Sequence, residues 1–100
     1  MRRIDLEGIP WVEPAAGVRS RTADHGGRRV RLVELAPGFR EPEWCRKAHV
    51  GYVLAGRLEI VFAEGAETLS AGDALVIAAG ERHRASVVEG PVRLFLVEDV

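Results

Sequence analysis

Short runs of alternating apolar and polar residues make up most of the chain and are separated by turn-forming residues. Residues 57–62 (Arg-Leu-Glu-Ile-Val-Phe) alternate cleanly, which predicts a strand with one buried face. Residues 29–35 alternate in the same way. The turn signal His25-Gly26-Gly27 joins them to the extended stretch 18–23, and the whole region is therefore predicted to form a β-hairpin.

The rest of the chain repeats this pattern of short strands and Gly-, Pro- or Asp-containing turns. Further strands are predicted at residues 50–54, 67–70, 74–78, 83–88 and 92–97. The predicted turns lie at residues 36–38, 55–56, 64–66, 71–73, 79–82 and 89–91. No stretch has the length and periodicity of a helix beyond a turn or two. About eight or nine short strands at this spacing are typical of an all-β sandwich or barrel.

The first 16 residues differ from this regular pattern. Pro10 and Pro14 flank Trp11 and break any regular element into short extended pieces. We therefore expect residues 1–16 to form an extended segment that lies along a barrel domain of residues 17–100, with Trp11 as its anchor. A chain of 100 residues has room for one domain.

Composition and charge exclude several classes of partner. The 14 basic and 15 acidic residues are interspersed and give a net charge of -1, so the sequence shows no footprint of nucleic-acid or membrane-surface binding. No apolar run approaches the length of a membrane span or follows the arginines of the N-terminus. The single cysteine, Cys45, excludes an internal disulfide. These features favour a cytoplasmic protein that binds small molecules or other proteins.

Residues whose side chains can bind a metal or take part in catalysis are concentrated between residues 42 and 56. This stretch contains the only cysteine and the only lysine, together with one of three histidines. Side chains alternate along an extended chain, so Glu43, Cys45 and His49 can share one face. Trp44 and Arg46 then lie on the other face, and Trp44 and Tyr52 are interpreted as packing or subunit-contact residues.

Two motifs in this region resemble those of small single-domain cupins. The first cupin motif is His-x-His, three or four residues, Glu, six residues, Gly; here Glu43-x-Cys45 is followed after three residues by His49 and after six by Gly56. The second motif is Gly, five residues, Pro, one residue, Gly, two residues, His, three residues, Asn. Here it reads Gly72, Ala78, Gly80, His83 and Val87 at the same spacing. The resemblance covers roughly residues 30–97 and implies a jelly-roll β-barrel.

The resemblance also implies a metal site inside the barrel. Carried over position by position, the usual three histidines and one glutamate become Glu43, Cys45, His49 and His83. A thiolate and two imidazoles suit zinc, whereas Glu43, His49 and His83 alone would make the two-histidine, one-carboxylate face of non-haem iron enzymes. Nickel, copper and manganese stay open as alternatives.

Each of these residues also has a plainer interpretation. Cys45 can be a small buried hydrophobe, His83 a core histidine bonded to a backbone carbonyl, and Glu43 a solvated loop residue. A thiol site, with Cys45 activated by His83, is a further alternative. Direct pairing of Cys45 with His49 is not expected, because four residues of strand separate them by roughly 13 Å unless the strand bulges.

The family resemblance leaves the function open between two classes. The first is a metal-dependent oxygenase, isomerase or lyase that acts on an anionic small molecule, with Arg31 and Lys47 as candidate substrate-binding residues. The second is a ligand- or metal-binding module without turnover, such as a sensor or storage domain, since one fold serves many functions. A homodimer is expected from the resemblance and from exposed apolar segments.

Overall fold

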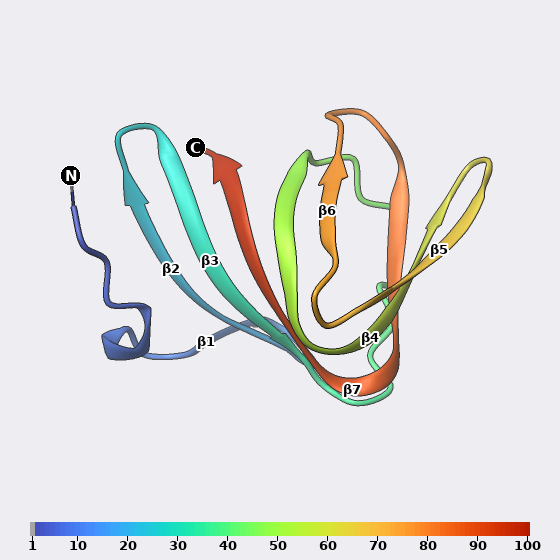
Figure 1. The fold of residues 1–100 in the computed structure, drawn as a ribbon, viewed down its shortest axis with the longest axis horizontal. Helices are drawn as coiled ribbons and strands as arrows, with labels where there is room; N and C mark the ends of the chain where they lie inside the picture. Colours follow the sequence, from blue (N-terminus) through green and yellow to red (C-terminus); the bar gives the residue numbers. More distant parts are fainter. Residues whose placement is uncertain (1) are drawn as a thin grey trace.

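A computed structural model describes residues 2–100 of the chain. These residues form seven strands and one short 3-10 helix, η1 (Leu6–Gly8) (Figure 1). The strands are β1 (Val12–Ala15), β2 (Val18–His25), β3 (Arg28–Leu35), β4 (His49–Phe62), β5 (Gly65–Ser70), β6 (Ala74–Ile77) and β7 (His83–Asp99). All strand pairs are antiparallel. The prediction of an all-β fold is confirmed.

Two long strands, β4 and β7, each run through both layers of the barrel. The first half of β4 pairs with β6 and with the second half of β7, which continues through β3 and β2 to β1. The second half of β4 pairs with β5 and with the first half of β7. Figure 1 shows the first set side by side as one layer and β5 with the bent halves of β4 and β7 as the other.

The expected turns at residues 55–56 and 89–91 are wrong, and the strand count falls accordingly. In both places the chain bends but keeps its partner strand, so β4 and β7 stay continuous. The register between β4 and β7 shifts near Gly56, which has a φ of 81° and therefore adopts a backbone conformation that suits glycine. A bulge and a bend carry the same residue signals as a turn, which explains the error.

The hairpin expected around Gly26 and Gly27 is confirmed. Val18 pairs with Leu35 and His25 with Arg28, and both glycines have positive φ angles of 60° and 79°. Consecutive positive φ angles are those of the two-residue turn that matches strand twist.

The N-terminal segment is extended apart from η1, and β1 adds to the edge of β2. The Arg19 and Arg21 guanidinium groups each lie 4.3 Å from the centre of the Trp11 ring, so Trp11 contacts the barrel as expected of an anchor. Met1 lies outside the described residues, and the proposed boundary at residue 16 stays a prediction.

The core lies between the two layers. β3, β4 and β7 supply most of its buried side chains, which alternate along these strands with side chains that are more exposed. They are Val33, Leu35, Val53, Leu58, Ile60, Leu69, Leu75, Ile77, Val92, Leu94 and Leu96. Among residues 2–100, no helix is long and apolar enough to cross a membrane.

Candidate metal centre

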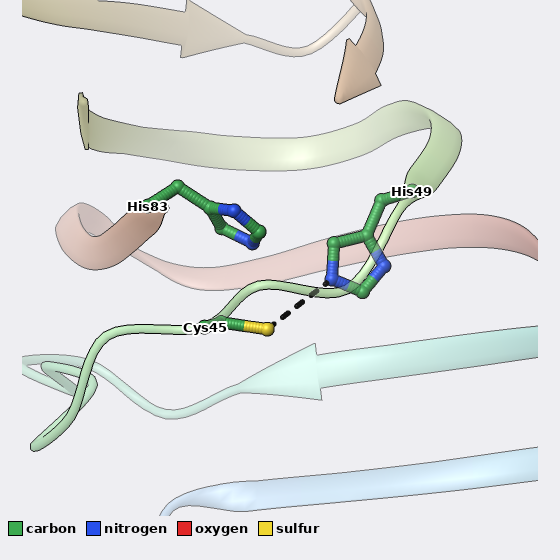
Figure 2. Close-up of side chains that lie close together, drawn as sticks. All are labelled: Cys45, His49 and His83. Atoms are coloured by element: carbon green, nitrogen blue, oxygen red, sulfur yellow. Dashed lines mark hydrogen bonds between the residues drawn. The ribbon is translucent and has the colours of Figure 1, made fainter. Parts of the chain in front are cut away.

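Three potential metal ligands converge at one end of the space between the layers. One ligand atom from each of Cys45, His49 and His83 lies within 4.8 Å of the other two. Figure 2 shows the three side chains pointing toward a common space, although they come from the loop before β4, the start of β4 and the start of β7. The imidazole rings of His49 and His83 meet nearly at right angles, with their centres 5.3 Å apart.

His83 is held by its backbone and by one ring nitrogen. Its N–H donates to the Cys45 carbonyl (2.9 Å) and its carbonyl accepts from the Cys45 N–H (2.8 Å), which joins the two ligands directly. Its Nδ1 lies 2.9 Å from the Glu81 carbonyl oxygen, which can only accept, so Nδ1 carries the proton and Nε2 keeps a free lone pair. His83 is therefore a carbonyl-bonded core histidine and, at Nε2, a competent ligand.

His49 is oriented by a carboxylate that the sequence analysis did not single out. Its Nδ1 lies 3.0 Å from Oε2 of Glu98, although the contact is off the direction of a good N–H···O hydrogen bond and Nδ1 has no other partner. The contact favours a proton on Nδ1 and leaves Nε2 free. Burial lowers the pKa of His49, and the negative charge of Glu98 only partly opposes this shift, so the ring is held in the neutral form that binds metals.

Cys45 lies close to His49, contrary to expectation. Its Sγ is 3.9 Å from His49 Nε2, within reach of a weak S–H···N hydrogen bond. The estimate from strand spacing was wrong because residues 46–48 are not part of a strand: Cys45 makes an isolated bridge with His83, and β4 begins only at His49. The irregular residues 46–48 bring the two side chains together. His49, as well as His83, is therefore available to a thiol site at Cys45.

The remaining predicted site residues are distributed unevenly. Glu43 is exposed and does not belong to the group formed by Cys45, His49 and His83. Two residues earlier, Glu41 is half-buried and lines the adjoining cavity, where its Oε1 accepts the N–H of Ala85 (2.9 Å). Arg31 and Lys47 both line that cavity as well.

The cavity has a volume of about 270 Å³ and lies between the two layers of the barrel. Its walls are mostly apolar, and its polar side chains are Arg31, Glu41, Cys45, Lys47, His49 and His83. An apolar pocket with a few convergent polar groups is the usual form of a small-molecule site. The three candidate ligands therefore face a space that can hold a small molecule.

The two cationic side chains that line the cavity, Arg31 and Lys47, differ in whether they form an ion pair. Arg31 is paired with Glu98, since its Nη1 lies 3.1 Å from Oε1, and both side chains are largely buried. Lys47 forms no ion pair within residues 2–100. Arg31 is thus already paired with a carboxylate, while Lys47, an exposed side chain, has no ion-pair partner among the described residues.

The residues present fit a divalent transition metal. One thiol and two imidazoles with free Nε2 atoms are good ligands for zinc, iron or nickel. Ligand atoms around one zinc ion lie about 3.3–3.6 Å apart, given the usual Zn–N and Zn–S lengths and tetrahedral angles. The Cys45–His49 contact of 3.9 Å and the 4.8 Å limit on the whole group are wider, so metal binding would draw the three ligand atoms closer together. Three protein ligands are also the number that catalytic zinc sites use.

Sequence reasoning missed Glu98 and Glu41. The inward-facing series Val92, Leu94 and Leu96 places residue 98 on the same face, so alternation alone carried the signal for Glu98. Glu41 lies on no strand, and no comparable signal was present.

Comparison with known families and structures agrees with this architecture. The sequence model of the cupin domain family matches residues 31–98, which is more than half of the chain. The chain belongs to the cupin family. No curated protein sequence matches it.

Several solved cupin-like structures have the same fold at low sequence identity. KdgF from Halomonas sp. superposes with a TM-score of 0.80 at 20% identity, covering 94% of this chain and 89% of that one. Ectoine synthase from P. lautus gives 0.80 at 17% identity, with 99% and 78% covered. A cupin-superfamily sugar phosphate isomerase from Silicibacter pomeroyi gives 0.73 at 22% identity, with 96% and 74% covered. Identities this low establish the shared fold alone, and with it the predicted jelly-roll barrel.

Proposed function

We propose that this chain is a metal-binding cupin that binds or acts on a small anionic molecule inside its barrel. The observation that carries the proposal is the convergence of Cys45, His49 and His83 on the edge of a 270 Å³ cavity. A bound divalent metal would polarise a carbonyl or carboxylate oxygen of the ligand. The lone unpaired thiol of Cys45 also supports a cytoplasmic location.

The other side chains of the cavity would exclude water, bind the anionic group and position His49. The apolar walls exclude water, which strengthens polar contacts to the bound molecule. Lys47 supplies the free positive charge for an anionic group, whereas Arg31 holds Glu98 and through it His49. Of the two predicted substrate-binding residues, we therefore assign direct anion binding to Lys47 and a positioning role to Arg31.

Elemental analysis of the purified protein tests the metal site. We expect about one zinc, iron or nickel per chain in the wild type and its loss in Cys45→Ala and His83→Ala. His25→Ala is the matched control, because His25 is an exposed histidine at the hairpin turn and should leave the metal content unchanged. A wild type that stays metal-free after incubation with each metal would refute the proposal and leave a thiol site to be tested by titration of Cys45.

Oxygenase, isomerase or lyase chemistry is the catalytic form of this proposal, and a non-catalytic sensor or storage module is the alternative. The number of protein ligands, three as in catalytic zinc sites, supports catalysis. The alternative is supported by two other charged side chains of the cavity that already have partners. Arg31 is paired with Glu98, and the Glu41 carboxylate accepts the Ala85 N–H. Comparing anion binding and anion turnover by wild type and Lys47→Glu distinguishes the two: binding without turnover would select the module.

A further inference from the structure

The polar and apolar side chains that line the cavity are segregated along its length. The candidate ligands Cys45, His49 and His83 converge at one end (Figure 2). Lys47 lies at the same end, because it is part of the irregular link between Cys45 and His49, and its side chain is exposed. These four residues form the polar mouth of the cavity.

Below the polar mouth, the inward positions of the strands are apolar. On β7, the inward positions that follow Glu98 toward the interior are Leu96 and Leu94, and both line the cavity. On the second half of β4, the corresponding wall residues are Ile60 and Leu58. Leu58 lies four residues below the level of the β4–β7 pair that contains His83, which is about 13 Å along a strand. The apolar part of the cavity is therefore deep compared with its polar mouth.

The walls offer no partner for a ligand hydroxyl. Among residues 2–100, no serine, threonine, tyrosine or tryptophan lines the cavity, and the chain contains no asparagine or glutamine. Hydroxyl and amide side chains are the neutral groups that donate hydrogen bonds to a ligand and also accept them. A polyhydroxylated molecule would bury hydroxyls without partners here, which strongly disfavours its binding.

The charged side chains of the cavity suit a ligand with one negative charge. Arg31 is already paired with Glu98 (3.1 Å), whereas Lys47 has no ion-pair partner among the described residues. Glu41 also lines the cavity, and its carboxylate would repel a second anionic group on the ligand. The single anionic group is therefore expected at the polar mouth, beside Lys47.

The volume of the cavity limits the size of the ligand. A protein cavity of about 150 Å³ holds benzene, with its six carbon atoms, so one of this size should hold about ten non-hydrogen atoms. Its volume is about 270 Å³. A straight-chain carboxylate of about eight carbons matches this capacity.

We propose that the ligand class of this cavity is a monocarboxylate with an apolar chain or ring. The carboxylate lies beside Lys47 at the polar mouth, and the apolar part lies against the walls formed by β4, β6 and β7. This assignment rests on the proposed function and narrows its anionic molecule to one class. It excludes sugar acids and sugar phosphates, which are anionic but polyhydroxylated.

Calorimetric titration with butanoate, hexanoate, octanoate and decanoate tests the assignment, on purified protein whose metal content is measured in the same sample. Each added methylene should lower the Kd about three- to fourfold as far as octanoate, and decanoate should gain nothing more. Gluconate has the six-carbon chain of hexanoate with added hydroxyls. It should bind at least about 100-fold more weakly than hexanoate.

A variant of the wall tests whether the chain lies inside the cavity. Ala85 lines the cavity and is half-buried, so the larger side chain of Ala85→Leu should occupy part of the apolar space. The preferred carboxylate should then shift from octanoate to about hexanoate, given the three carbons added. Ala66→Leu is the matched control, because Ala66 is exposed on β5 and does not line the cavity. Circular dichroism checks that each variant is folded.

A variant of the polar mouth tests the position of the charge. Lys47→Gln should weaken octanoate binding about tenfold, because it removes a charged hydrogen-bond donor. Octanol has the same chain without the charge, and its affinity should not change.

Four outcomes would overturn the assignment. Gluconate binding as tight as that of hexanoate, or a Kd that does not depend on chain length, would do so while the proposed function stands, because gluconate is also a small anion. An unchanged preference for octanoate in Ala85→Leu would place the chain outside the cavity. Octanoate binding that is insensitive to Lys47→Gln would remove the anion from the polar mouth. The metal content of the same sample reports separately on the metal site.

Discussion

Glu98 is the residue on which the geometry of the candidate metal centre most depends. Its carboxylate contacts His49 Nδ1 and pairs with Arg31, and its side chain is only 11% exposed. A carboxylate on the far nitrogen of a ligand histidine orients the ring and raises its basicity. Its influence on a metal would therefore pass through His49.

Replacing Glu98 with glutamine should weaken metal binding by about 10–100-fold without removing a ligand. The change takes away the negative charge beside His49 and the partner of Arg31. Competition titration with a metal-binding dye measures the affinity. Asp99→Asn is the control, since Asp99 is exposed and pairs with Arg28 on the outer face. Equal affinities in Glu98→Gln and wild type would contradict the role of Glu98.

The lowered pKa of His49 predicts how the stability of the metal-free protein depends on pH. Burial opposes protonation in the folded state, whereas the unfolded chain takes up a proton near pH 6.5. The contribution of His49 is thus fully present above about pH 6.5 and is lost as the pH falls through the lower folded-state pKa. The slope is at most about 1.4 kcal/mol per pH unit for one proton.

Urea unfolding between pH 5 and 8, with chelator present, measures this dependence. His49→Gln should flatten the decline below pH 6.5, whereas His25→Gln, at an exposed turn, should follow the wild type. A wild type and His49→Gln variant with parallel profiles would show that His49 does not contribute.

The candidate ligands themselves were predictable residue by residue, whereas their surroundings were not. Cys45, His49 and His83 stood out as rare, ligand-type residues in cupin spacing, and the fold brings them together. Glu43 was chosen by the same spacing, but it lies in the irregular approach to β4, where alternation no longer decides which way a side chain points. Distant pairings such as Glu98 with His49 depend on how β7 lies beside β4, which no local pattern encodes.

At the scale of elements, the bend of β4 at Gly56 is the feature that lets one strand serve both layers. Gly56 has a φ of 81°, and a Cβ at this position would lie 2.5 Å from the Pro91 carbonyl oxygen and 2.8 Å from that of Glu89. Backbone of β7 therefore occupies the space that any side chain would need. The sequence signalled the special backbone of Gly56 but not that the strand continues past it.

Gly56→Ala should destabilise the protein by more than about 2 kcal/mol. The positive φ alone costs about 1–2 kcal/mol for a residue with a Cβ, and displacement of the β7 backbone adds to it. The midpoint and slope of urea unfolding measure the change. Gly26→Ala is the control, because Gly26 also has a positive φ (60°) but open space around it, and it should lose only the conformational part. Similar losses in the two variants would mean that the contact with β7 is unimportant.

At the scale of the whole molecule, a metal would join parts that the chain order keeps apart. Cys45 and His49 precede and begin β4, while His83 begins β7. A ligand that binds only the folded state stabilises it by about 2.7 kcal/mol at 100 times its dissociation constant. For a domain of this size we expect the melting temperature to rise by roughly 10–20 °C.

Calorimetry of wild type and Cys45→Ala, each with metal and with chelator, checks this expectation. Only the wild type should show the full metal-dependent rise. A rise of the same size in Cys45→Ala would place the metal elsewhere in the molecule.

The central position of β7 has a consequence for biosynthesis. β7 pairs with β3 across up to 71 residues of sequence, as in Arg28 with Asp99, and it also pairs with both halves of β4. Until β7 has been translated and has left the ribosome, β2–β3 and β4–β5 are isolated hairpins without a partner for their apolar faces, and such hairpins are marginal in water. This domain should therefore stay exposed to chaperones and proteases until β7 emerges, and its folding should be slowed by the long loops that the pairing of β7 must close.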